Sequence, residues 1–178
     1  MNQEKPFIKN WKPKQRTGHI QVKRAVYVGN FDPVTLGHVD IIQRSVCIAD
    51  QLVIGVKSQR QGGFMFSLEQ RMGYLRMALP DLQHVIIREC GQDIVNFART
   101  NSAEVMIRGV RNIADFEHEL HQSRINQKMD PGINTVLFMA DTQYSFLSSG
   151  IIRELLSFDK DISCFVPKTV ADLVKADK

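Results

Sequence analysis

The most unusual run of residues in this 178-residue sequence is GNFDPVTLGH, at positions 29–38. It follows a short apolar run and places Gly37 and His38 at the expected start of a helix. The unpaired N–H groups and the positive dipole end of a helix favour a phosphate, and a glycine permits close approach. A histidine there can donate a hydrogen bond to a phosphate oxygen and stabilise charge that develops during a reaction. A histidine that merely caps its helix is the simpler interpretation, but the neighbouring glycines and Asp-Pro turn favour phosphate chemistry.

A second candidate phosphate site is IRGVRN, at positions 107–112, between an expected strand and an expected helix. Arg108 and Arg111 flank a glycine, and guanidinium groups suit bidentate contacts with phosphate oxygens. Asp115 follows in the first helical turn, where a carboxylate complements the helix dipole. Arginines in surface loops are usually only solvated. The expected position of this segment beside His38 is what favours a phosphate-binding role.

A third candidate is TQYSFLSSGIIRE, at positions 142–154. Its serines stand at an expected helix N-terminus, where hydroxyl groups cap the helix and free backbone amides can hold phosphate oxygens. For this segment considered by itself, capping alone is the simpler explanation.

These segments separate an alternation of strands and helices. Short β-rich runs predict strands at 25–29, 52–57, 85–88, 104–108 and 134–139. Helical spacing predicts helices at 36–49, 67–79, 93–100, 112–128, 148–157 and 168–176. The order predicts an α/β fold, a Rossmann-like, doubly wound, five-stranded parallel sheet with helices on both faces, because parallel strands need crossovers and both faces need cover.

Such a sheet makes a prediction about the candidate segments. Ligands bind at the carboxyl ends of the strands, near the point where the strand order reverses. The loops after the first and fourth strands should therefore face each other across one cleft. Those two loops carry the first and second candidate segments.

Composition is that of an ordinary globular protein, and the length suits one domain, which we expect over 24–178. No apolar run approaches the ~18 residues of a membrane span, and the first residues lack the apolar stretch of a signal peptide. We therefore expect a cytoplasmic protein without a membrane partner. Cys47, Cys90 and Cys164 lack metal-site spacing, and we expect them to be buried and reduced.

The net charge of +4 comes from one end of the chain. Residues 1–24 carry seven lysines and arginines against one glutamate, whereas 25–178 carry sixteen basic and eighteen acidic residues. We therefore interpret 1–23 as a basic, flexible N-terminal extension. Two alternatives remain open for these residues. They could be a tether for nucleic acid or acidic lipid, or a segment that packs on a neighbouring subunit. The slightly acidic body argues against a nucleic-acid partner.

The three segments together resemble one family. The patterns G-x-F-D-P-x-T-x-G-H, I-R-G-x-R-x-x-x-D-F-E-x-E and S-F-x-S-S-x-x-x-[KR]-E, in this order, are similar to bacterial phosphopantetheine adenylyltransferases. The first pattern alone marks the wider T/H-x-G-H nucleotidyltransferase superfamily. The resemblance runs from about Arg24 to about Val170. It implies adenylyl transfer from ATP to 4′-phosphopantetheine in coenzyme A biosynthesis, with Mg²⁺ as cofactor, in a homohexamer.

The resemblance also implies roles for individual residues. His38 and Arg111 would be catalytic, with His38 stabilising the transition state at the α-phosphate. The implied ATP-binding residues are Asn30, Phe31, His38, Gly109, Val110, Arg111, Glu119, Tyr144, Ser145, Phe146, Leu147, Ser148, Ser149 and Gly150. The implied acceptor-binding residues are Asn30, Gly62, Ile94 and Arg108.

The sequence departs from the family pattern mainly on the acceptor side. Asn30 stands where the family usually has threonine, and Gly62 stands where it carries a substrate-binding lysine. Asp93 replaces an apolar residue of the pantetheine pocket, and Gly150 replaces a common serine. Lys57 or Arg60 would have to substitute for the lysine, although neither is in register.

These departures leave other functions open. One is nucleotidyl transfer to a different phosphate acceptor, such as nicotinamide mononucleotide or a polyol phosphate. Another is a nucleotide-binding protein that has lost catalysis and acts as a regulator or scaffold. Retention of His38, Arg108 and Arg111 opposes the second, because a scaffold has little use for a transition-state donor.

Overall fold

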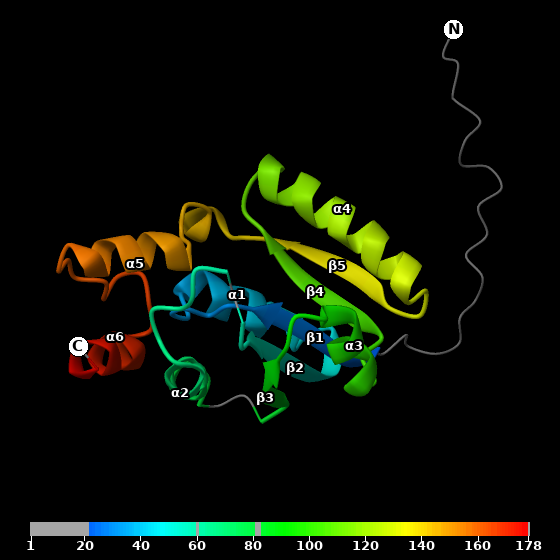
Figure 1. The fold of residues 1–178 in the computed structure, drawn as a ribbon, viewed down its shortest axis with the longest axis horizontal. Coiled ribbons are helices and arrows are strands. Elements are labelled where there is room, and N and C mark those ends of the chain that lie inside the picture. Colours follow the sequence, from blue (N-terminus) through cyan, green and yellow to red (C-terminus); the bar gives the residue numbers. More distant parts are fainter. Residues whose placement is uncertain (1–21, 60, 81–82, 178) are drawn as a thin grey trace, which may run out of the picture.

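The computed structural model describes residues 22–59, 61–80 and 83–177, and its centre is one parallel sheet (Figure 1). The strands are β1 (Val22–Gly29), β2 (Ala49–Lys57), β3 (Val85–Cys90), β4 (Val105–Val110) and β5 (Asn134–Met139). Their order is β3-β2-β1-β4-β5, and every pair is parallel. The chain thus winds from β1 outward in one direction, returns to the centre, and winds outward in the other, as predicted for a doubly wound sheet.

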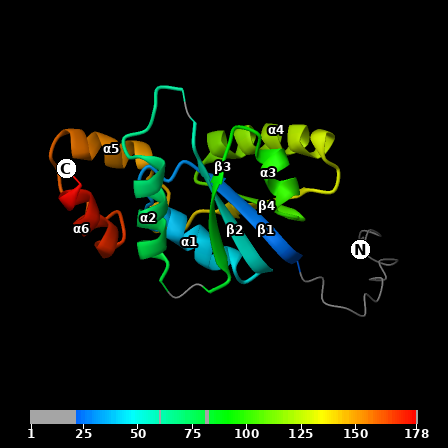
Figure 2. The ribbon, with the colours of Figure 1, turned by 60° about the horizontal axis from the view of Figure 1, so that its bottom comes forward.

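Helices cover both faces of the sheet (Figures 1 and 2). They are α1 (Leu36–Ser45), α2 (Leu68–Ala78), α3 (Ile94–Thr100), α4 (Ile113–Met129), α5 (Ser149–Ser157) and α6 (Lys168–Ala176). The larger core joins one sheet face to α1, α2, α5 and α6, and the smaller core joins the opposite face to α3. α4 lies on the α3 side, where the amide of Asn126 contacts the sulfur of Met106. The predicted α/β fold is confirmed.

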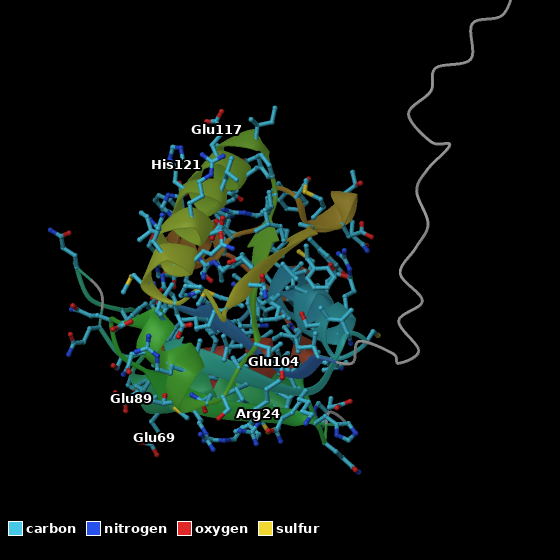
Figure 3. The ribbon with its side chains drawn as sticks, turned by 90° about the vertical axis from the view of Figure 1, so that its right-hand side faces the viewer. Arg24, Glu69, Glu89, Glu104, Glu117 and His121 are labelled. Carbon is cyan, nitrogen blue, oxygen red and sulfur yellow. The ribbon has the colours of Figure 1, made fainter. Side chains whose placement is uncertain are left out.

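The central strand β1 is buried on both faces, as its apolar sequence requires. Successive side chains alternate between faces, so that Tyr27 enters the larger core and Val26 and Val28 enter the smaller one. At the amino ends of the central strands, the backbone of Glu104 donates to the carbonyl of Arg24, and Figure 3 shows these two residues near each other. The loops that contain the candidate segments follow the opposite, carboxyl ends of the strands.

Most helix starts coincide with a capping residue. The side chains of Thr35, Ser67, Asp93, Asn112 and Ser148 each accept from the backbone N–H three residues later, which satisfies a free donor of the first turn. The capping box predicted between Ser67 and Gln70 is confirmed, and its two hydrogen bonds measure 3.2 Å and 2.9 Å.

Two sequence predictions are wrong in detail. The helix predicted over 36–49 ends at Ser45, and Ala49 opens β2 by pairing with Val22. Apolar spacing over the last turn fits either structure, and pairing with β1 decides it. Cys47 and Cys164 are exposed, so the expectation of burial holds only for Cys90.

The expected N-terminal extension is described only at its end. β1 begins at Val22, so residues 22–23 belong to the sheet, two residues before the predicted boundary. Residues 1–21 lie outside the described residues. Over the part of the chain that the structure describes, no helix is both long and apolar enough to cross a membrane.

Candidate active site

The loops after β1, β4 and β5 surround one cleft of about 350 Å³ at the carboxyl edge of the sheet. The prediction that the loops after the first and fourth strands share a cleft is confirmed. Its lining consists of Tyr27, Asn30, Phe31, Thr35, Gly37, His38, Ile41, Gly109, Arg111, Ala140, Tyr144, Leu147, Ser148, Ser149, Gly150 and Arg153. A cleft of this size, at a reversal of strand order, is a usual place for a nucleotide.

The structure divides the predicted residues into two groups. Those that line the cleft are Asn30, Phe31, His38, Gly109, Arg111, Tyr144, Leu147, Ser148, Ser149 and Gly150. Those outside its lining are Val110, Glu119, Ser145 and Phe146 from the ATP set, and Gly62, Ile94 and Arg108 from the acceptor set. Ten of the fourteen residues predicted to bind ATP therefore share one surface, whereas Asn30 is the only lining residue among the four predicted to bind the acceptor.

His38 lies in the first turn of α1, held by the helix-capping residue Thr35. Thr35 donates its backbone N–H to His38 Nδ1 over 3.0 Å, and its hydroxyl lies 2.9 Å from the same nitrogen. The Phe31 ring packs 5.0 Å from the imidazole, centroid to centroid. Burial, and then the charge of Arg111, lower the pKa of His38 to about 4. The imidazole is therefore neutral at pH 7 and can meet a phosphate as a hydrogen-bond donor.

Arg111 lies across the cleft, directly after β4. Its Nε and Nη2 donate to the two carboxylate oxygens of Asp115, at 2.8 Å and 3.2 Å, and Nη1 donates to the Leu147 carbonyl over 3.4 Å. Hydrogen bonds from Arg111 hold the pKa of Asp115 below its usual range. Asp115, predicted as a partner for the helix dipole, thus also orients the guanidinium group toward the cleft.

Gly37 makes room for the loop after β5. A Cβ atom at this position would lie 3.4 Å from the Cβ of Tyr144. The glycine of the T-x-G-H pattern therefore lets α1 and the segment around Tyr144 approach each other closely.

Arg153 is a lining residue that the sequence reasoning left without a role. Its Nη1 donates to the backbone carbonyl of Asp32 over 2.8 Å and lies 3.4 Å from the Asp32 carboxylate. The [KR]-E ending of the third pattern contained the signal for it. Tyr27 was also missed, because it stands inside an apolar strand. Burial raises its pKa to about 12, so its phenol stays protonated.

Asp32 and Arg71 join the β1 loop to the loop after β2. The buried carboxylate of Asp32 accepts from the backbone N–H groups of Met65 and Phe66, at 3.1 Å and 3.0 Å. Arg71, 1% exposed, donates to three backbone carbonyls from two different loops. These acceptors are Asn30, Lys57 and Phe66, at 2.8 Å, 2.9 Å and 3.0 Å. The base of the acceptor-side loop is therefore tied to the nucleotide loop.

Arg108, predicted to bind the acceptor phosphate, is paired within the chain. Its Nε and Nη2 donate to the two carboxylate oxygens of Glu119 at 2.7 Å and 2.6 Å, and Nη1 donates to the Val28 carbonyl over 2.9 Å. A bidentate pair of this kind is strong. An acceptor phosphate must therefore share or displace Glu119 to reach this guanidinium group.

The remaining acceptor-side residues lie apart from the cleft lining. Gly62 has a φ of +82°, and a Cβ atom built on it would meet no atom within 4 Å. Ile94 opens α3, and the neighbouring Asp93 caps that helix through the N–H of Asn96 over 2.8 Å. Asp93, the charged residue in the expected pantetheine pocket, therefore acts as a helix cap. Arg60, one candidate substitute for the lysine, lies outside the described residues.

Comparison with known proteins places this cleft in a family. Residues 26–155 match the cytidylyltransferase-like family model. A phosphopantetheine adenylyltransferase of Lachnoclostridium phytofermentans is 41% identical over 153 residues, covering 86% of this chain and 94% of that protein. The chain belongs to the phosphopantetheine adenylyltransferase family. A second relative of that name, from Moorella thermoacetica, is 42% identical over 84% of this chain and 93% of its own length.

The cytidylyltransferase-like match contains the whole candidate site, because every lining residue of the cleft falls within residues 26–155. Among solved structures, a bifunctional NMN adenylyltransferase/ADP ribose pyrophosphatase from Francisella tularensis has a TM-score of 0.58 at 17% identity. The similarity covers 75% of this chain and 41% of that one. At this identity the likeness shows the fold alone.

Proposed function

We propose that the protein transfers the adenylyl group of ATP to 4′-phosphopantetheine, which gives dephospho-coenzyme A and pyrophosphate. The observation that carries the proposal is the pairing of His38 and Arg111 across one cleft, in a chain that belongs to the phosphopantetheine adenylyltransferase family. A phosphate oxygen of the acceptor attacks the α-phosphorus of ATP, and the bond from that phosphorus to the bridging oxygen of pyrophosphate breaks. The acceptor arrives ionised, so the reaction requires no protein base.

The residues of the cleft contribute position and charge. Neutral His38 donates a hydrogen bond to an α-phosphate oxygen as negative charge develops there, and Arg111 supplies a fixed positive charge from the opposite side. The first-turn backbone N–H groups of α5, beside Ser148 and Ser149, donate to phosphate oxygens. Catalysis by positioning and preorganised electrostatics suits phosphoryl transfer, which needs little covalent chemistry from the protein.

We propose that Mg²⁺ enters with ATP, coordinated by the phosphate oxygens. Within the described ranges, no group of three or more His, Cys, Asp or Glu side chains is arranged to hold a metal. The phosphate-facing residues are instead donors, such as His38 and Arg111. These fit a nucleotide that brings its own cation, because Mg²⁺ usually combines substrate phosphates with water.

We propose a homohexamer in the cytoplasm, as the resemblance implies. Support comes from apolar side chains that α4 exposes, namely Ile113, Phe116, Ile125 and Met129. Ile113 is 78% exposed, which is unusual for an isoleucine in a monomer. Figure 3 shows Glu117 and His121 projecting from the same helix. Light scattering coupled to size exclusion tests the number of subunits.

A nucleotidyltransferase with a different phosphate acceptor is the second candidate. Gly62 provides no charge where the family has lysine, and Arg108 is engaged by Glu119. Both observations concern the acceptor, and neither alters the nucleotide side of the cleft.

The test is pyrophosphate release with ATP and Mg²⁺, run with 4′-phosphopantetheine, nicotinamide mononucleotide and glycerol phosphate in parallel. Release only with 4′-phosphopantetheine supports the proposal and makes Asn30 and Gly62 tolerated variants. Turnover with another acceptor only would establish the second candidate. No pyrophosphate release with any of the three acceptors, together with measurable ATP binding, would favour a non-catalytic nucleotide-binding protein.

A further inference from the structure

We propose that Thr35 is a positioning residue that holds His38 in the neutral tautomer with its proton on Nε2. Thr35 is 1% exposed and caps α1. Its backbone N–H lies 3.0 Å from His38 Nδ1, its hydroxyl oxygen lies 2.9 Å from the same nitrogen, and the His38 N–H donates to that oxygen over 3.4 Å. Two groups of Thr35 therefore converge on one nitrogen of the ring.

The chemistry of these groups determines where the proton lies. A backbone N–H can only donate, so Nδ1 must accept and cannot carry a proton in this geometry. The Thr35 hydroxyl accepts from the His38 backbone and is free to give its own proton to Nδ1 as well. The proton of the neutral ring must then be on Nε2, the nitrogen that Thr35 does not reach. A ring protonated on both nitrogens would set its Nδ1 proton against the N–H of Thr35.

A second capping box in the same chain shows what is particular about this one. At the start of α2, Ser67 accepts from the Gln70 N–H, and the Gln70 side chain accepts from the Ser67 N–H over 2.9 Å. The hydrogen-bond pattern is the one that joins Thr35 and His38. Gln70 lies outside the cleft lining, so the capping box of Ser67 and Gln70 stabilises the start of α2 and does not orient a cleft residue.

His38 occupies the position of Gln70 but has a second ring nitrogen that the box does not use. The imidazole lines the cleft, beside Phe31 and opposite Arg111. The capping box of α1 thus leaves a single donor, the Nε2–H group, for a ligand. A phosphate oxygen needs such a donor, whereas the other tautomer would present a lone pair and repel it.

The first test reads the tautomer directly by long-range ¹H–¹⁵N NMR of the imidazole-labelled protein at pH 7. The expected spectrum has Nε2 as the protonated nitrogen of His38 and Nδ1 as the unprotonated one. A His38 ring that carries its proton on Nδ1, or on both nitrogens, would overturn the proposal. This readout needs no turnover, so it is independent of the proposed adenylyl transfer.

The second test compares three variants by pyrophosphate release. Thr35→Val removes the hydroxyl, and we expect kcat to fall roughly 10- to 100-fold, the usual loss when an orienting partner is removed, with the KM for ATP changed by only a few-fold. Thr35→Ser keeps the hydroxyl and should restore most of kcat. Ser67→Ala removes the matching cap of α2 and should retain full kcat despite a similar loss of stability.

The kinetic outcomes separate positioning from folding. Full kcat in Thr35→Val would show that the hydroxyl does not orient His38, and equal losses of kcat in Thr35→Val and Ser67→Ala would reduce Thr35 to an ordinary cap. If wild-type protein released no pyrophosphate with any acceptor while its NMR spectrum showed the Nε2–H ring, the proposed function would fail and the tautomer assignment would stand.

Discussion

The two sides of the candidate site are built on different principles. On the nucleotide side, His38 is held by its helix cap and Arg111 by both oxygens of Asp115, at distances of 2.8 Å and 3.2 Å. On the acceptor side, the tip of the β2 loop carries Gly62 and Gly63, with φ of +82° and +74° and no atom within 4 Å of either Cβ position. The proposed nucleotide side is preorganised, whereas the loop tip on the proposed acceptor side is open.

The difference is confined to the tip of the acceptor-side loop. Its base is anchored by Asp32, which accepts from Met65 and Phe66, and by Arg71, which donates to carbonyls at both ends of the loop. Side chains at the tip can therefore change without disturbing the nucleotide loop. This explains how the chain can keep His38 and Arg111, the proposed transition-state residues, while Gly62 stands where the resemblance implies a lysine.

Removing the His38 imidazole gives the sharpest test of the preorganised side. His38→Ala deletes one well-placed donor, and such a loss costs about 10²- to 10³-fold in kcat. ATP affinity should stay within a few-fold of wild type, because the donor acts mainly on charge in the transition state. Pyrophosphate release gives the rate and titration calorimetry gives the affinity. His84→Ala, at an exposed histidine outside the cleft lining, is the control. Turnover of His38→Ala at a tenth of wild type or better would contradict the assigned role.

Removing the anchor between the two sides should cost stability. Arg71→Met leaves three backbone carbonyls without their donor and removes one of the positive charges near the buried Asp32 carboxylate, which keeps Arg153 at 3.4 Å. We expect unfolding free energy to fall by about 3–5 kcal/mol, measured by urea denaturation. Arg76→Met lies on the exposed face of the same helix and should change it by less than about 0.5 kcal/mol. Similar losses in both variants would mean that the loop base is not anchored by Arg71.

Arg71 also shows where sequence reasoning ends. It stands five residues before Arg76 on α2, and nothing in composition or spacing distinguishes a buried arginine from a solvated one there. Its role depends on carbonyls from two different loops, which only the folded chain brings together. His38 and Arg111 were predictable because His38 opens the helix after β1 and Arg111 directly follows β4, and parallel-sheet topology places both connections at one edge.

The acceptor side was less predictable for a related reason. The strand-to-helix spacing places Arg108 near the cleft but does not reveal that Glu119, in the second turn of α4, accepts from two guanidinium nitrogens, Nε and Nη2. Similarly, the sequence predicts a helix start at Asp93 but not whether its carboxylate serves a cap or a ligand. Side-chain pairing between elements is set by packing geometry, which periodicity does not encode.

The pH dependence of stability and of kcat distinguishes a neutral hydrogen-bond donor at His38 from an acid–base residue. His38 has a folded-state pKa of about 4, against its ordinary value of 6.5, because burial and Arg111 disfavour the charged ring. Because the folded pKa is lowered, its contribution to stability is present above pH 6.5 and is lost as the pH falls toward 4. The stability advantage of wild type over His38→Gln should therefore shrink over that range in urea titrations. A kcat that rose through a pKa between pH 6 and 8 and lost this step in His38→Gln would contradict a neutral donor.

The smallest effect is expected from restoring a charge at the open tip. Gly62→Lys meets no steric obstacle, although its positive φ costs a non-glycine residue about 1–2 kcal/mol of stability. An exposed charge contact contributes about 0.2–1 kcal/mol, so the KM for 4′-phosphopantetheine should fall by up to about fivefold while the KM for ATP stays unchanged. Gly63→Lys carries the same strain and charge one position out of register and should leave both constants near wild type. If both variants lowered the KM for 4′-phosphopantetheine equally, a positive charge anywhere at the tip would attract the acceptor, and position 62 would not be specific. If Gly62→Lys changed the KM for ATP instead, the loop tip would belong to the nucleotide half of the site. The division between an anchored nucleotide side and an open acceptor side would then be wrong.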